Sequence, residues 1–366
     1  MPHFLGYDYF KLSFFVLFVA ASWQNLSKVV IPMQLNRQEP KRILRAFCAL
    51  LLAAVMLLTP IFTIGAQAQE IRRWTTGATI HSATITATDR ATYLTFLTSD
   101  KIQFAFWYTR HAVNLHIYGA RAFPGAVSMS ENPIFTSAVW NGNVLSLTLT
   151  TVDGFMGYHA FYDQSDNLII RFRNPPSSLA VTRVVIDPGH GGQDRGAEGF
   201  RTDLPEAVLN RQVSNLLAEE LRALGVTVLV LDTAPGMEIR ERVRQAEQFD
   251  ADIFISVHHN AARNTNATGT EVWYTTRFSR VLAATISRNV STNIDTLNRG
   301  ARRLNFGVTA SRQFISVMVE VGFMSNRAEH DKLIDPAYQQ ETVRGITDAV
   351  VAIVNHSYPG TGRRFS

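Results

Sequence analysis

The sequence predicts an α/β fold, with a mainly parallel sheet flanked by helices, preceded by a small all-β N-terminal domain. Between residues 71 and 176, short runs rich in Thr, Val, Ile, Tyr and Phe alternate with polar breaks, which is typical of hairpin-connected strands. Beyond residue 183, apolar strands alternate with amphipathic helices, and this order favours an α/β domain. At 366 residues the chain is long enough for two domains.

The first segment carries the runs ATITATD, ATYLTFLT, KIQFAFWY, AVNLHIYG, VLSLTLTTV, GYHAFYD and NLIIRFR. It has no cluster of histidines and carboxylates, so we assign it no chemistry. Its aromatic residues Phe104, Phe106, Trp107 and Tyr108 are expected to pack in a core rather than form a platform for sugars. Residues 174–178, Asn-Pro-Pro-Ser-Ser, indicate a linker, because paired prolines are excluded from helices and sheet interiors.

The elements expected after the linker alternate in type. Strands are predicted at 183–186, 227–231, 252–257, 270–274 and 314–319, and helices at 204–224, 238–249, 277–293 and 338–355. In a parallel sheet, ligands bind at the carboxyl ends of the strands. Polar residues at those ends are therefore the first candidates for a site.

Composition and charge exclude several classes of protein. The chain is 46% hydrophobic and 18% charged, with a mean hydropathy of +0.01, which argues against polytopic membrane and disordered proteins. Most of the net charge of +5 comes from residues 1–69, which contain six basic and two acidic side chains. The rest of the chain is nearly neutral, so no nucleic-acid partner is indicated. Because Cys48 is the one cysteine, any metal must be held by His, Asp or Glu.

Residues 1–68 are predicted to be a leader. From Met33 the sequence gives a positive stretch, an uncharged apolar run at 46–64, and Ala66-Gln67-Ala68, which is the order of a secretory signal peptide cleaved after Ala68. An uncleaved membrane anchor is the alternative. The apolar stretch at 10–23 lacks a cleavage site, so Met33 is the expected start. We expect an exported protein, periplasmic or associated with the cell wall, without a stable membrane span after cleavage.

Three predicted strands end in polar residues of chemical interest. The first predicted strand is followed by Asp-Pro-Gly-His190 and the third by His258 and His259. The fifth, which ends in the apolar run 317–319, is followed by Glu320, and Glu206 lies near the start of the first long helix. A carboxylate at the end of an apolar run is costly unless it is paired or functional. Successive residues of a strand point to opposite sides, so one of the two adjacent histidines can face a shared site.

Two histidines and one glutamate around a metal, with a second glutamate nearby, are the residue types of a catalytic zinc site. Such a site hydrolyses amides without a protein nucleophile. The H-E-x-x-H motif and the G-x-S-x-G elbow are both absent from the sequence.

The segment from about 183 to 356 resembles the zinc-dependent N-acetylmuramoyl-L-alanine amidases of the amidase-3 family. The resemblance rests on VVIDPGHGGQDRGAEG, LPEAVLNRQVSNLLAEELRALG, RERVRQAEQFDADIFISVHHNA, GTEVWY, RGARRLNF and VMVEVGFMSN. It implies an amidase/phosphorylase-like fold that cleaves the amide between N-acetylmuramic acid and L-alanine in peptidoglycan. It also implies that His190, Glu206 and His258 hold Zn²⁺ and that Glu320 is catalytic. His259 falls on a position that varies in the family. The resemblance therefore implies that it is not a zinc ligand and that it contacts, at most, the ligand residues or the substrate.

The sequence departs from the family pattern at two places. Ala207 replaces a usual lysine, and Leu231-Asp232-Thr233 lacks a usual arginine. Some members carry an inhibitory helix before the last catalytic strand, and residues 270–293 leave little room for one, so we expect an open site that needs no activator protein. The β-rich segment resembles, more weakly, modules that target these amidases to the wall.

The expected organisation is a leader (1–68), a β-rich wall-targeting domain (69–174), a linker (175–182), a catalytic domain (183–358) and a tail (359–366). Two other functions are compatible with these residues. One is a zinc peptidase that cuts the peptide stem, and the other is a wall-binding protein with a structural or vestigial metal site. Because Glu320 accompanies the three ligands and a structural zinc site needs no base, the amidase is the favoured interpretation.

Overall fold

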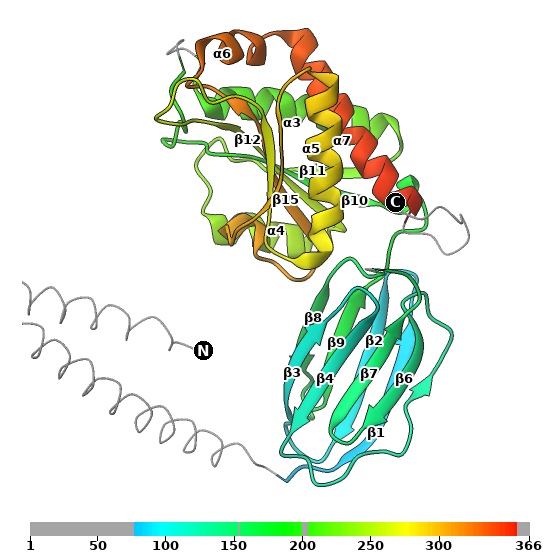
Figure 1. Cartoon of the computed structure of the whole chain (residues 1–366). Helices are drawn as coiled ribbons and strands as arrows, with labels where there is room; N and C mark the ends of the chain where they lie inside the picture. The colour runs from blue at the N-terminus through cyan, green and yellow to red at the C-terminus, as the bar shows by residue number, and fades with distance from the viewer. Residues whose placement is uncertain (1–76, 153, 200–203, 357–366) are drawn as a thin grey trace, which may run out of the picture. The chain divides into compact units, whose positions relative to one another are not determined.

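The computed structural model describes residues 77–152, 154–199 and 204–356 (Figure 1). All of them belong to one compact unit, residues 73–366. The predicted signal peptide, with Cys48, and the tail at 359–366 lie outside the described residues. No helix in the described ranges is long and apolar enough to cross a membrane.

Residues 80–173 form nine strands in two sheets. One sheet has the order β5-β1-β2-β9-β8 and the other β3-β4-β7-β6. The strands are β1 (Ile80–Ala87), β2 (Ala91–Thr98), β3 (Gln103–Tyr108), β4 (Ala112–Tyr118), β5 (Ser128–Met129), β6 (Phe135–Asn141), β7 (Val144–Leu149), β8 (Tyr158–Tyr162) and β9 (Leu168–Arg173). Phe172 of β9 contacts Phe135 of β6, and Phe96 of β2 contacts Trp140 of β6, so the two sheets share a core.

The expectation for the aromatic residues of β3 is confirmed at three positions and wrong at one. Phe104, Phe106 and Tyr108 pack against the core, whereas 44% of Trp107 is exposed. Alternation along the strand is the cause, since Trp107 points to the face opposite its two neighbours.

The α/β segment, residues 183–356, is built on a six-stranded sheet of order β11-β10-β12-β15-β13-β14. Its strands are β10 (Arg183–Pro188), β11 (Thr227–Val230), β12 (Ile253–Asn260), β13 (Thr270–Tyr274), β14 (Asn298–Arg303) and β15 (Ile315–Phe323). Every neighbouring pair is parallel except β13 and β15. The mainly parallel sheet predicted from the sequence is therefore confirmed.

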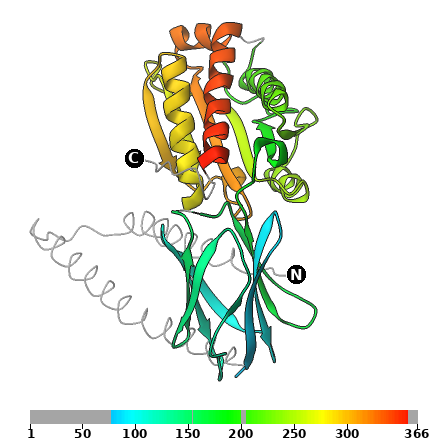
Figure 2. The same cartoon turned by 90° about the vertical axis from the view of Figure 1, so that its right-hand side faces the viewer.

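Helices cover both faces of this sheet (Figures 1 and 2). They are α3 (Glu206–Ala223), α4 (Ile239–Gln248), α5 (Arg280–Asn293), α6 (Arg327–Leu333) and α7 (Pro336–His356), with short turns η1 (Leu179–Val181), η2 (Arg277–Ser279) and η3 (Gly307–Thr309). Val184 and Ile186 of β10 join the apolar cluster beneath α3, α5 and α7. Val185 faces the other way and packs with Ala246 of α4. Because both faces of the sheet are covered, Val184, Val185 and Ile186 in the middle of β10 are all apolar.

Two strands are longer than the sequence indicates. The ladder between β12 and β15 continues through the pair His258 and Glu320, with a β-bulge before Asn260. Both residues are therefore strand residues, and the expectation that they follow the strand ends is wrong. The parallel partner strand supplies the hydrogen bonds that keep these polar residues in extended conformation. β14 and α6 were not expected from the sequence.

Arginine–aspartate ion pairs, one of them buried on both sides, join the two-sheet segment to the α/β segment. Arg173 is 2% exposed and pairs with Asp250 and with the buried Asp252. Arg90 pairs with the same two carboxylates, and Arg171 reaches Asp250.

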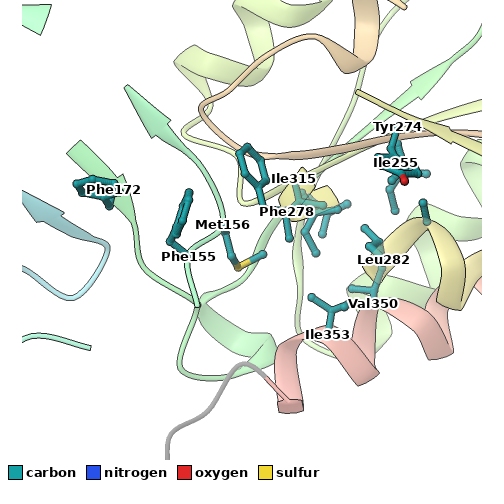
Figure 3. Packing of buried hydrophobic residues seen from close by; sticks show 14 of the residues in the cluster. Phe155, Met156, Phe172, Ile255, Tyr274, Phe278, Leu282, Ile315, Val350 and Ile353 are labelled. Carbon is teal, nitrogen blue, oxygen red and sulfur yellow. The ribbon is translucent and has the colours of Figure 1, made fainter. Parts of the chain in front are cut away.

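Apolar packing continues across the same boundary. Phe155 and Phe172 lie on one side, and Phe278 and Ile315 lie on the other (Figure 3). The rings of Phe155 and Phe278 have centroids 5.7 Å apart. Residues from both segments belong to a single buried apolar cluster.

We expect Arg173→Met to lower the free energy of unfolding by about 3 kcal/mol, because removing one partner leaves buried Asp252 with less compensating charge. Denaturant titration measures the loss. Arg171→Met is the matched control, since Arg171 is 19% exposed and makes one ion pair, to Asp250, among the described residues. Equal losses of unfolding free energy in the two variants would contradict the role of Arg173 as the partner of buried Asp252.

Asp250 predicts a specific acid sensitivity. Burial opposes ionisation of its carboxyl, but hydrogen bonds and charge from Arg173, Arg90 and Arg171 outweigh burial and hold its pKa well below the ordinary value. A lowered pKa in the folded state stabilises the fold at neutral pH, and this stabilisation is lost as pH falls below the unfolded value of about 3.9. Unfolding titrations across this range should show a shallower decline with acidification for Asp250→Asn than for the wild type.

Candidate active site

The loop after β10 places His190 at the carboxyl edge of the sheet. His190 has a φ of 64°, in the left-handed region that residues with a side chain adopt uncommonly. Arg242 of α4 restrains the loop, donating to the His190 carbonyl at 2.8 Å and to the buried Asp187 carboxylate at 2.6 Å. A side chain at Gly189 would lie 2.3 Å from the ring of His258. The glycine therefore lets the two histidine rings approach, with centroids 4.9 Å apart.

Glu206 is the first residue of α3 and is 4% exposed. Its Oε2 lies 3.1 Å from His190 Nε2, and its Oε1 lies 2.9 Å from His258 Nδ1. The backbone N–H of Ala197 also donates to Oε2, at 2.9 Å. One ligand atom from each of the three residues falls within 4.8 Å of the others. The structure thus brings together the three residues that the sequence nominated as metal ligands.

The electrostatics of this cluster suit a cation. Burial opposes ionisation of Glu206, but hydrogen bonds from His190 and His258 keep its pKa below the ordinary value. The hydrogen bond to Glu206 in turn raises the pKa of His190 to about 9, against the effect of burial. Two imidazoles and one carboxylate are donors that zinc prefers, and a divalent cation would take the place of the hydrogen-bonded protons between the imidazoles and the carboxylate.

A second layer of hydrogen bonds orients these residues. Asp194 Oδ2 lies 2.8 Å from His190 Nδ1, which leaves Nε2 directed at Glu206. Asn210, one turn along α3, donates to Glu206 Oε1 at 3.3 Å and to the Gly189 carbonyl at 3.1 Å. Spacing alone gave no reason to select Asp194 or Asn210 from the sequence, although each lies four residues after the residue that it orients.

His259 points away from His258, as strand alternation predicts. Its ring is 1% exposed, and Nδ1 lies 2.7 Å from Asn210 Oδ1. Because Asn210 uses its nitrogen as a donor, Nδ1 carries the proton. Burial lowers the pKa of His259 to about 4, so the ring is neutral. The ring contacts Asn210, and the backbone N–H of His259 donates to Glu206 Oε1 at 3.2 Å.

Glu320 lies beside the cluster, paired in register with His258 across β12 and β15. Its Oε2 is buried and has no hydrogen-bond partner among the described residues. Burial raises the pKa of Glu320 to about 7. A carboxyl that exchanges its proton near neutral pH, next to a cluster of metal-binding type, has the properties of a general base for hydrolysis.

Comparison with known proteins identifies the family. The sequence profile described as N-acetylmuramoyl-L-alanine amidase, amidase-3, matches residues 184–352, a range that includes His190, Glu206, His258 and Glu320. The Bacillus subtilis protein YqiI, itself uncharacterised, is 33% identical over 172 residues, which cover 46% of this chain and 82% of YqiI. This chain belongs to the amidase-3 family. The resemblance identified in the sequence is therefore confirmed.

Other amidase-3 relatives match over the same half of the chain. The N-acetylmuramoyl-L-alanine amidase LytC of Bacillus subtilis is 32% identical over 174 residues, which cover 46% of this chain and 35% of LytC. The chain thus spans about a third of the length of this relative. A crystal structure of an N-acetylmuramoyl-L-alanine amidase from Clostridium difficile 630 is 31% identical, covering 48% of this chain and 98% of the other, with a TM-score of 0.46.

We expect Asp194→Asn to weaken zinc affinity about 10- to 100-fold, because loss of a carboxylate that orients a ligand histidine typically has this effect. Competition against a zinc-binding dye measures the affinity. Asp232→Asn is the control, since Asp232 is 80% exposed and does not contact the cluster. Unchanged affinity in Asp194→Asn would refute the orienting role.

Proposed function

We propose that this protein is a zinc-dependent N-acetylmuramoyl-L-alanine amidase, which hydrolyses the amide bond between N-acetylmuramic acid and L-alanine in peptidoglycan. The observation that carries the proposal is the cluster of His190, Glu206 and His258 with Glu320 in register beside it, in a chain of the amidase-3 family. Cell-wall remodelling or the separation of daughter cells is the corresponding role.

In this proposal zinc is held by His190 Nε2, His258 Nδ1 and the Glu206 carboxylate. When bound, the metal supplies Lewis acidity to the substrate carbonyl and to water. The residues of the chain fit this task, because their donor atoms converge and the outer contacts of Asp194 and Asn210 fix their directions.

Glu320 acts as general base and then as general acid. Water attacks the lactyl carbonyl carbon while the Glu320 carboxylate takes one of its protons. The carbon–nitrogen bond then breaks, and the same proton passes to the leaving L-alanine nitrogen. A pKa raised to about 7 by burial suits both transfers, since a proton carrier works best when its pKa is close to the working pH.

The surroundings of the site support a constitutively open enzyme. Between β13 and α5 the chain forms the turn η2 (Arg277–Ser279), which leaves no room there for an inhibitory helix. We therefore propose that no activator protein is needed. We further propose an exported protein, in the periplasm or at the cell wall, with a wall-binding domain at 69–174, a linker at 175–182 and the catalytic domain at 183–358.

Glu320→Gln should reduce hydrolysis of purified peptidoglycan by about 10²- to 10⁴-fold, the usual contribution of a general base, while zinc remains bound. Mass spectrometry of the released products and metal analysis of the protein provide the two measurements. Wild-type protein should release stem peptides with an amino-terminal L-alanine. A chelator should abolish this release, and added zinc should restore it.

Glu219→Gln, on the exposed face of α3, is the matched control and should retain full activity. Shortened stems still attached to sugar would assign the protein as a peptidase instead. Full activity in Glu320→Gln would remove Glu320 from the mechanism.

A further inference from the structure

A pair of arginines on β14, Arg299 and Arg302, is anchored beside the candidate active site by one buried carboxylate. Glu271 of β13 is 4% exposed. Its Oε2 lies 2.9 Å from Arg299 Nε and 3.2 Å from Arg302 Nε. Its Oε1 accepts a hydrogen bond of 2.8 Å from Asn260 Nδ2. We call Arg299 and Arg302 the arginine pair.

The sheet register places this pair close to the proposed base. Glu271 lies opposite Glu320 across β13 and β15, and directly paired residues of neighbouring strands share a face of the sheet. The charge of Glu271 also contributes to the raised pKa of Glu320. β14 is the strand beyond β13. Arg302 pairs with Trp273, which pairs with Met318, two residues before Glu320. Two strand spacings and this offset place the backbone of Arg302 about 12 Å from that of Glu320.

The pair combines excess positive charge with exposure and rigidity. Two guanidinium groups face the single carboxylate of Glu271, while 27% of the Arg299 side chain and 42% of the Arg302 side chain remain exposed. Each guanidinium also lies over an aromatic ring, Arg299 over Phe323 at 4.9 Å and Arg302 over Trp273 at 5.6 Å. Within the described residues, neither terminal nitrogen of Arg302 makes a hydrogen bond.

We propose that the arginine pair binds a carboxylate on the peptide side of the substrate, so that the enzyme selects acidic stem peptides. This inference rests on the proposed amidase function. Arg302, held near Glu271 at Nε, presents its two terminal nitrogens as a fork that matches a carboxylate. Arg299 already donates Nη1 to the Thr268 carbonyl at 3.2 Å and adds positive charge beside this fork. Two extended peptide residues span about 7 Å, which together with the reach of a side chain covers the distance from the scissile bond to β14.

The alternative is that these arginines only protect the exposed edge of the sheet, since charged residues on edge strands prevent pairing with other chains. Arg303 provides the matched control for this alternative. It lies on the same strand and is exposed, but its Nε donates to the carbonyl of Thr275 and not to Glu271. If the arginines only protect the edge, substitution of Arg302 and of Arg303 should have the same consequences. If they bind a carboxylate, substitution of Arg302 alone should weaken binding of the acidic substrate.

The test compares N-acetylmuramoyl-L-alanyl-D-glutamate with the same compound carrying amides in place of both carboxyl groups. The full-length wild-type protein, Arg302→Gln and Arg303→Gln are assayed for cleavage with zinc. We expect Arg302→Gln to raise KM for the diacid about tenfold, with kcat little changed and with no effect on the diamide. Arg303→Gln should behave as the wild type with both compounds.

Binding to Glu320→Gln protein, with and without Arg302→Gln, gives a readout that needs no turnover. Tighter binding of the diacid than of the diamide, abolished by Arg302→Gln, supports the proposal. Equal affinity for the two compounds, absence of binding, or equal effects of Arg302→Gln and Arg303→Gln would overturn it. Failure of the wild type to cleave peptidoglycan would instead refute the amidase function, which separates the two failures.

Discussion

The Glu206 carboxylate organises the catalytic end of this structure. A buried, ionised carboxylate is costly unless charge and hydrogen bonds compensate it, and here the compensation comes from five groups. His190 approaches from the loop after β10 and His258 from β12. Asn210 donates from α3, and the backbone N–H groups of Ala197 and His259 donate from the loop before α3 and from β12. Removal of the carboxylate would leave two clustered imidazoles without a common partner. The positions of the loop, the helix start and the strand end are therefore interdependent.

The geometry of the loop that carries His190 follows from the need to bring both histidines to the Glu206 carboxylate. Close approach of the two histidine rings needs a glycine at 189, and the left-handed conformation of His190 is held by Arg242 and Asp194. Arg242 belongs to α4, on the face of the sheet opposite α3. Helices on both faces thus contribute to one edge of the sheet, and a defect in either of them reaches the candidate metal site.

Sequence patterns predicted the elements with strong apolar periodicity and missed those defined by tertiary pairing. β14, Asn298–Arg303, has the sequence NRGARR, which carries no alternation of apolar residues, and it is a strand because β13 provides its hydrogen bonds. Glu320 could be selected because it interrupts an apolar run, whereas Glu206 was assigned through the family motif. Asp194, Asn210 and the partners of Glu271 depend on contacts between distant segments, which no local pattern encodes.

The contact between Arg173 and Asp252 fixes how far the two-sheet segment lies from the candidate metal site. Asp252 immediately precedes β12, and His258 lies on β12 six positions later, a distance of about 20 Å at the rise of a β-strand. The two-sheet segment is thus attached at the amino ends of the parallel strands, whereas the metal-binding cluster lies at their carboxyl ends. Strand β12 acts as a rigid spacer of fixed length. Under the proposed function, a glycan strand bound by the two-sheet segment would therefore meet the cluster at least about 20 Å from the attachment of that segment.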